Sequence, residues 1–173
     1  MTFDKNLTCF KAYDVRGKLV EELNEDIAYR IGRATAQSQK AQTVVIGFDA
    51  RETSPDLADA VAKGVCDAGT DVLDIGLAGT EEMYAAVTEF GACVGVEVTA
   101  SHNPIDYNGM KIVRRGSQPL SEKEFGLIKD LVVENSFSQP QKVGEVLHKK
   151  IVARAAYVEK VLRFVDCSRL KPF

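Results

Sequence analysis

The 173-residue sequence has no tryptophan, two histidines, five prolines and four cysteines. The cysteines are far apart in the chain and form neither a C-x-x-C pair nor a group with histidine at metal-ligand spacing, which argues against a zinc site and a disulfide framework. Because free cysteine is among the most buried residue types, each is expected to be a small hydrophobic residue of the core: Cys9, Cys66, Cys93 and Cys167.

The sequence also lacks a dense block of lysine and arginine and a long apolar run. Its formal net charge of −3 does not favour binding to nucleic acid or to an anionic membrane surface. No stretch approaches the roughly 20 apolar residues of a membrane span, and residues 1–10 lack the basic and apolar pattern of a secretion signal. We therefore expect a cytoplasmic protein with a small-molecule partner and without nucleic-acid or membrane partners.

The residues that are present favour a folded α/β protein. Hydrophobic residues make up 45% of the chain and charged residues 27%, a balance typical of globular domains. Apolar runs at 43–48, 71–76 and 92–98 predict buried strands, with a short strand at 111–113. Helical spacing follows the capping residues Asn24, Ser54, Thr80 and Ser121, and a last helix is expected over 151–165. This alternation predicts a three-layer α/β/α sandwich with a mostly parallel mixed sheet.

The segment T-A-S-H-N-P, residues 99–104, directly follows the strand that ends at Val98. In open α/β sheets, ligands bind beyond the carboxyl ends of the strands, so this position favours a functional site. Ser101 supplies a hydroxyl group and Lys111 a positive charge, while the dipeptides Asn103-Pro104 and Asn108-Gly109 are expected to form turns that fix the shape of the loop.

Three interpretations of Ser101 compete. A serine-hydrolase nucleophile requires a G-x-S-x-G turn, but Thr99 and Asn103 stand at the glycine positions, and the other histidine of the chain is the distant His148. A serine with only a turn-forming role needs no cation nearby. A phosphoryl carrier needs cations and backbone donors around a group of about −2 charge.

Two further motifs offer such cations. The segment F-K-A-Y-D-V-R-G, residues 10–17, contains Tyr13 and Arg16 and is expected to form a loop. The segment G-F-D-A-R, residues 47–51, follows a predicted strand, so Arg51 should lie at the same sheet edge as Ser101. For either arginine, a solvated surface charge is the alternative. The three motifs together favour the phosphoryl carrier.

These motifs, with P-x-D-Y-N-G-x-K at residues 104–111, resemble the α-D-phosphohexomutase family and most closely its bacterial phosphomannomutase branch. The resemblance implies that Ser101 is phosphorylated and exchanges its phosphoryl group with a hexose phosphate through a hexose 1,6-bisphosphate. For the closest branch, the reaction interconverts mannose 6-phosphate and mannose 1-phosphate. Phosphoglucomutase and phosphoglucosamine mutase are alternatives because they share the serine loop.

The resemblance also implies roles for individual residues. Ser101, Lys111, Arg16 and His102 would be catalytic, although His102 could instead simply hydrogen-bond the loop. The residues that would shape the site are Tyr13, Asn103, Asn108, Gly109 and Arg51. Mg²⁺ would be the cofactor, and Ser101 would contact it through its phosphate.

The sequence differs from the family pattern in length. The resemblance covers the first of four domains, expected at residues 1–149, and a helix at 150–173 that leads toward a second domain. The family's D-G-D-x-D-R metal loop, its G-E-x-S sugar loop and its last phosphate-binding loop are absent. We therefore expect the chain to be inactive alone and to act with the remaining domains of the same protein. A non-catalytic phosphate-binding or interaction module is the alternative from another functional class.

Overall fold

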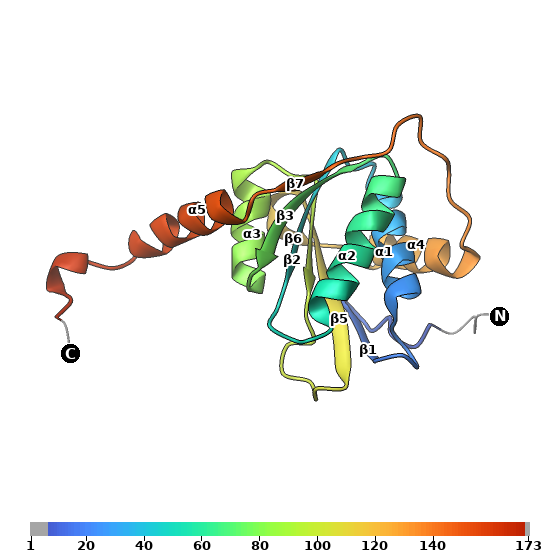
Figure 1. Ribbon diagram of the computed structural model, residues 1–173, viewed down its shortest axis with the longest axis horizontal. Helices are drawn as coiled ribbons and strands as arrows, with labels where there is room; N and C mark the ends of the chain where they lie inside the picture. The colour runs from blue at the N-terminus through green and yellow to red at the C-terminus, as the bar shows by residue number, and fades with distance from the viewer. Residues whose placement is uncertain (1–6, 172–173) are drawn as a thin grey trace.

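The computed structural model of the protein describes residues 7–171. Within this range, seven strands form one sheet in the order β1-β5-β4-β2-β3-β7, with β6 paired to β5 (Figure 1). The strands are β1 (Val15–Lys18), β2 (Thr43–Phe48), β3 (Asp71–Leu77), β4 (Val94–Val98), β5 (Tyr107–Arg114), β6 (Gln118–Pro119) and β7 (Val146–His148).

The sheet is mixed, as predicted. The pairs β2–β3, β2–β4 and β3–β7 are parallel, whereas β5 is antiparallel to β1, β4 and β6. Strand β5 therefore runs antiparallel to the other six strands of the sheet. Because β4 and β5 are consecutive, the carboxyl end of β4 and the amino end of β5 lie at the same edge and are joined there by residues 99–106.

Three sequence expectations at this edge were wrong. The strand expected at 111–113 is longer, because Tyr107–Met110 pair with β1, a strand that the sequence did not reveal. Asn108-Gly109 therefore lies inside β5 and forms no turn. The segment expected to form a loop at 10–17 ends in β1, where Arg16 is paired opposite Gly109.

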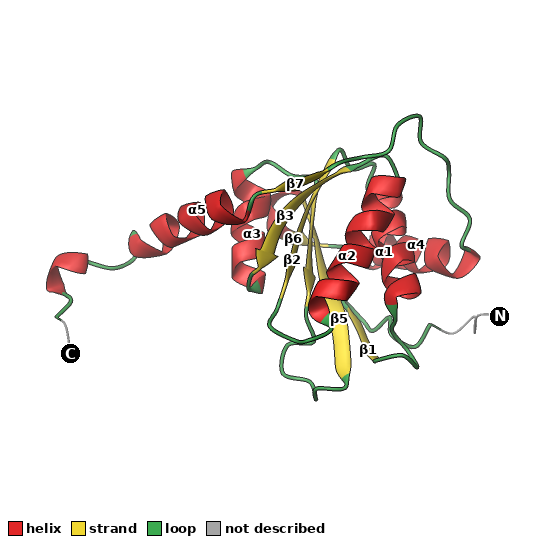
Figure 2. Cartoon of the chain, viewed as in Figure 1, coloured by secondary structure: helices red, strands yellow, loops and turns green. Residues whose placement is uncertain are grey.

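Helices cover both faces of the sheet and complete the expected three layers (Figure 2). One face packs against α1 (Glu25–Ser38), α2 (Ser54–Asp67) and α4 (Glu122–Glu134). The other face packs against α3 (Thr80–Glu89) and the first turn of α5 (Lys150–Leu162). Short 3-10 turns lie between β5 and β6, at Arg115–Ser117, and after α5, at Cys167–Arg169.

The helix amino-termini follow the sequence signals only in part. Asn24 accepts a hydrogen bond from the Ile27 amide at 3.0 Å, and Ser121 forms the expected capping box. The expected caps Ser54 and Thr80 were wrong, since each is the first residue of its helix after Thr53 and Gly79. The Ser54 hydroxyl instead donates to Asp49 at 2.6 Å, so tertiary contact replaced local capping.

Helix α5 extends away from the sheet, and only Ala153 of this helix is buried (Figure 1). It ends at Leu162, three residues before the expected end. Its apolar residues are largely exposed, with Ile151 at 84% and Val158 at 44%. Across residues 7–171, no helix has both the length and the apolar character needed to cross a membrane.

Candidate active site

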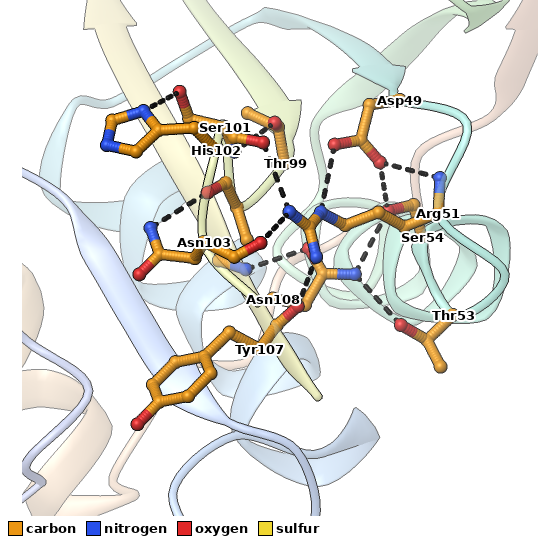
Figure 3. Close-up of polar contacts among 12 residues, drawn as sticks. Asp49, Arg51, Thr53, Ser54, Thr99, Ser101, His102, Asn103, Tyr107 and Asn108 are labelled. Carbon is orange, nitrogen blue, oxygen red and sulfur yellow. Dashed lines mark hydrogen bonds and ion pairs between the residues drawn. The ribbon is translucent and has the colours of Figure 1, made fainter. Parts of the chain in front are cut away.

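The loop that carries Ser101 is attached to the sheet at both ends. The Thr99 amide donates to the Gly109 carbonyl at 3.0 Å, which continues the pairing of β4 with β5. The Asp49 amide donates to the Val98 carbonyl at 3.0 Å, so the segment after β2 lies beside the same loop. The structure therefore brings Ser101 and Arg51 to one sheet edge (Figure 3).

Arg51 holds the loop through its backbone carbonyls. Its Nη1 atom donates to Pro104 at 2.8 Å and Tyr107 at 3.1 Å, and its Nη2 atom donates to Asn103 at 2.6 Å and Ser101 at 3.1 Å. Its Nε atom lies 3.5 Å from a carboxylate oxygen of Asp49. Because the planar guanidinium uses its donors on the loop, Arg51 fits the loop-shaping role and is not an available phosphate ligand.

A buried polar chain supports this clamp from behind. The fully buried Asn108 donates from its side-chain amide to the hydroxyl oxygens of Thr53 at 2.9 Å and Ser54 at 3.0 Å. Ser54 donates in turn to Asp49, and the same Asp49 oxygen accepts from the Arg51 amide at 3.0 Å (Figure 3). Asn108 therefore connects β5 to the start of α2 and indirectly to the serine loop.

Ser101 itself is exposed and has a left-handed backbone conformation, with φ of +54°. Its amide donates to the Thr99 hydroxyl at 2.8 Å, and its carbonyl accepts from Arg51. Its own hydroxyl lies 3.2 Å from Nδ1 of His102. The side chain of Asn103 donates to the Ala100 carbonyl at 2.9 Å, which closes the turn. The loop thus presents the Ser101 hydroxyl to solvent while its backbone is fixed.

The contact of His102 with Ser101 is compatible with both of its expected roles. A neutral imidazole could accept the hydroxyl proton, or it could hold the hydroxyl in one rotamer. Both residues are exposed, and the ring has no other hydrogen-bond or ion-pair partner within residues 7–171.

Arg16 reaches the loop from β1. Its guanidinium donates to the Thr99 carbonyl and forms an ion pair with Asp14 at 2.8 Å. It passes over Gly109, where a Cβ atom would meet the guanidinium and the Val15 carbonyl. Glycine at this position is therefore needed for close approach, and Arg16 fixes the start of the loop.

Two of the expected site residues stand apart from this network. Tyr13 is 74% exposed and has no hydrogen bond or ring contact with another described residue. Lys111 is exposed on β5 and likewise has no hydrogen-bond or ion-pair partner within residues 7–171. Among the expected cations, Lys111 is therefore the one whose charge is not already used in a protein contact.

The sequence analysis missed one buried acid next to the site. Glu97 on β4 is 1% exposed, and neither carboxylate oxygen has a hydrogen-bond partner in the described part of the chain. Loss of solvent, followed by the charges of Asp49, Glu82 and Glu81, raises the pKa of Glu97 to about 9. The sequence signal that could have revealed it was a glutamate inside the apolar run V-G-V-E-V, because buried strands rarely contain glutamate.

The described residues do not form a complete metal site. They contain no group of three or more His, Cys, Asp or Glu side chains placed to hold an ion. Mg²⁺ requires about six oxygen ligands in near-octahedral geometry. The Asp49 carboxylate is already occupied by Ser54 and Arg51. Residues 7–171 can therefore supply only a minor part of a magnesium coordination sphere.

Comparison with known proteins agrees with this geometry. Residues 7–139 match the family model described as phosphoglucomutase/phosphomannomutase, alpha/beta/alpha domain I. Phosphomannomutase of Escherichia coli K12 is 51% identical over 170 residues, which span 97% of this chain and 37% of that protein. A phosphomannomutase sequence of Klebsiella pneumoniae is 59% identical over 133 residues, 76% of this chain and 84% of that sequence.

A solved structure shows the same fold. The crystal structure of a phosphoglucomutase/phosphomannomutase family protein from Burkholderia thailandensis superposes with a TM-score of 0.81 at 31% identity, covering 95% of this chain and 37% of that one. The chain thus spans little more than a third of these longer relatives. By its matched residues, its fold and its serine loop, the chain belongs to the phosphoglucomutase/phosphomannomutase family and corresponds to the α/β/α domain I of that family.

Proposed function

We propose that this chain is the phosphoserine domain of a phosphomannomutase and that Ser101 is the residue that carries the phosphoryl group. One observation carries the proposal. The exposed Ser101 hydroxyl projects from a loop whose backbone is held by four hydrogen bonds from Arg51 to carbonyl oxygens. Phosphoryl transfer depends mainly on alignment and on positive charge, so a fixed backbone with an open hydroxyl suits it.

The proposed reaction has two transfers. In the first, the bond between the Ser101 oxygen and phosphorus breaks, phosphorus bonds to a free hydroxyl oxygen of the hexose phosphate, and the proton of that hydroxyl passes to the Ser101 oxygen. In the second, the bond between the other phosphoryl group of the hexose 1,6-bisphosphate and its sugar oxygen breaks, phosphorus bonds to the Ser101 oxygen, and the hydroxyl proton of Ser101 passes to that sugar oxygen. The net result is an isomerisation between the 6-phosphate and the 1-phosphate.

The surrounding residues have different parts in this proposal. Lys111 provides positive charge for the equatorial phosphate oxygens, since it is exposed and unpaired within the described range. Arg16 and Arg51 fix the two ends of the loop through Thr99 and through residues 101–107. His102 hydrogen-bonds the serine hydroxyl and assists proton movement there.

The rest of the activity would come from beyond this chain. A bound Mg²⁺ would neutralise phosphate charge, and an oxygen of the Ser101 phosphate would be one of its ligands. The other ligands and the sugar-binding residues belong to the remaining domains of a longer protein. In this scheme residues 1–149 form the serine domain, residues 150–173 lead to the second domain, and the exposed apolar residues of α5 pack there. The 173-residue chain alone would not turn over substrate.

The test uses the full-length protein, purified and incubated with glucose 1,6-bisphosphate and Mg²⁺. We expect a gain of one phosphoryl group, mapped to the peptide that contains Ser101, and its loss in Ser101→Ala. Ser117→Ala is the matched control, because Ser117 also has a positive φ of +57° but lies outside the loop. An unmodified Ser101 in an active enzyme would overturn the proposal.

Substrate choice is tested separately. The ratio kcat/KM should be highest for mannose 1-phosphate when compared with glucose 1-phosphate and glucosamine 1-phosphate. The phosphomannomutase relatives at about half identity support this order. A higher value for either of the other sugars would retain the serine mechanism and assign a different substrate.

A further inference from the structure

Glu97 lies on β4 with its carboxyl group on the α3 side of the sheet. In the pairing of β2 with β4, Glu97 is opposite Gly47. A Cβ atom at Gly47 would lie only 2.5 Å from the Oε2 atom of Glu97. The absence of a side chain at Gly47 therefore provides the space that the carboxyl group occupies. Water is excluded as well, because Glu97 is 1% exposed.

The charges around Glu97 oppose its ionisation. Asp49 follows β2, and Glu81 and Glu82 lie in the first turn of α3; all three raise the pKa of Glu97. Arg154 on α5 is already paired with Glu82. An ionised carboxylate in this position would be buried without a hydrogen-bond donor, so the uncharged acid is the favoured form.

One cation is placed to change this balance. Lys111 lies directly opposite Glu97 in the antiparallel pairing of β4 with β5. Side chains at directly opposite positions share a face of the sheet, with Cβ atoms about 4.5–5.5 Å apart. Lys111 is exposed and has no partner within residues 7–171, and its flexible four-carbon stem allows its ammonium group to move.

We propose that Glu97 is a positioning residue for Lys111: as an uncharged acid it leaves the ammonium group free to meet the phosphoryl group of Ser101, and as a carboxylate it draws that group back onto the sheet. The change is a single ionisation. Glu97 releases one proton to solvent, and the resulting charge attracts the ammonium group across the strand pair. Rebinding of the proton releases Lys111 again.

The inference has two statements, and only the second, on the catalytic role of Lys111, rests on the proposed function. The pairing of Lys111 with ionised Glu97 is inferred from the strand register and does not depend on the proposed function. That the free form of Lys111 is the active form depends on the phosphoryl transfer proposed above. Two experiments test these two statements separately.

The first experiment follows the side-chain carboxyl carbon of Glu97 by NMR during a pH titration of the 173-residue chain, with Glu97→Gln to assign the signal. Removing the partner should stabilise the protonated form. We therefore expect Lys111→Met, or Lys111→Gln as a second variant, to raise the titration midpoint by roughly one pH unit or more. Arg114→Met is the control, because it removes a charge from β5 at a position paired with Val94. An unchanged midpoint in both Lys111 variants would overturn the pairing.

The second experiment measures kcat and KM of the full-length protein across the alkaline range. If ionised Glu97 pairs with Lys111, kcat of the unmodified protein should fall as Glu97 ionises. Glu97→Gln should not show this fall and should retain severalfold more activity at alkaline pH. Glu89→Gln, which removes an exposed charge from the last turn of α3, should follow the unmodified protein. The same alkaline fall in Glu97→Gln would overturn the positioning role. Unchanged mutase activity in Lys111→Met would instead overturn the proposed role of Lys111, whatever the NMR titration shows.

Discussion

The Nη2 atom of Arg51 lies 2.6 Å from the carbonyl oxygen of Asn103, although the two residues are 52 positions apart in the sequence. This contact is one of four between the same guanidinium and the serine loop. A planar fork with several fixed donors can hold such a set of carbonyls, and a lysine ammonium cannot. The loop conformation therefore depends on arginine at this position and not only on positive charge.

We accordingly expect Arg51→Lys to lower kcat of the full-length enzyme by roughly ten- to a hundredfold, since small displacements of a reacting group have effects of this size. Hydrogen exchange of residues 101–107 should become faster in the same variant. Arg115→Lys is the control, because Arg115 contacts the Gly91 carbonyl away from the loop. Normal exchange rates in Arg51→Lys would contradict the clamp.

The buried amide of Asn108 leads to a second prediction. Asn108→Asp preserves shape but replaces two donated hydrogen bonds, to Thr53 and Ser54, with a buried acceptor. We expect the free energy of unfolding to fall by about 2–4 kcal/mol, the usual cost of a buried group left without its partners. Urea unfolding measures the change. Asn135→Asp, at an exposed helix end, should change the stability by less than about 0.5 kcal/mol.

Two glycines offer a matched pair for a third prediction. At Gly109 a methyl group would meet the Val15 carbonyl and the Arg16 guanidinium, whereas at Gly126 it would meet nothing within 4 Å. Gly109→Ala should therefore destabilise the protein by about 1–3 kcal/mol. Gly126→Ala should stabilise it by about 0.5–1 kcal/mol, because alanine favours the interior of α4. Thermal unfolding of both variants checks the opposite signs.

The fourth prediction concerns stability and pH. Burial raises the pKa of Glu97 in the folded chain to about 9, well above the ordinary value of 4.5. The folded state therefore binds a proton more tightly than the unfolded state. Stability from this group is complete below the ordinary pKa and is lost as pH rises toward the folded pKa.

We expect the free energy of unfolding to decline between about pH 5 and about pH 9, by an amount on the order of a few kcal/mol. Glu97→Gln should flatten this decline. Hydrogen bonds lower the pKa values of Asp67, by Lys63, and of Glu124, by Ser121, so their contributions are lost only in more acidic solution. Equal slopes for Glu97→Gln and the unmodified chain in urea unfolding would contradict the prediction.

Local signals predicted much of the fold. The Asn24 cap and the Ser121 capping box depend on residues three positions apart, and the buried strands at β2, β3 and β4 are continuous apolar runs. Strand β1 was missed because its four residues are held by pairing with β5, which begins 89 positions after β1 ends. No residue pattern within a short stretch of sequence indicates such a long-range contact.

The same distinction applies to the site. Ser101 directly follows a predicted strand, and this position indicated the sheet edge at which it lies, because the carboxyl ends of parallel strands meet at one edge. The partners of Arg51 could not be predicted, since its donors meet carbonyls from residues 101–107, and backbone atoms leave no sequence signature. Glu97 was overlooked for a related reason. Its effect depends on Gly47 and on α3, which pack against it only in three dimensions.

The left-handed backbone of Ser101 limits which alcohol side chain the loop can hold at this position. Threonine has the same hydroxyl group and is phosphorylated by the same chemistry, but a branched Cβ is strongly disfavoured at a φ of +54°. Serine, with its small unbranched side chain, is tolerated there at a modest cost. The choice between these two alcohols at position 101 is therefore determined by backbone conformation and not by reactivity.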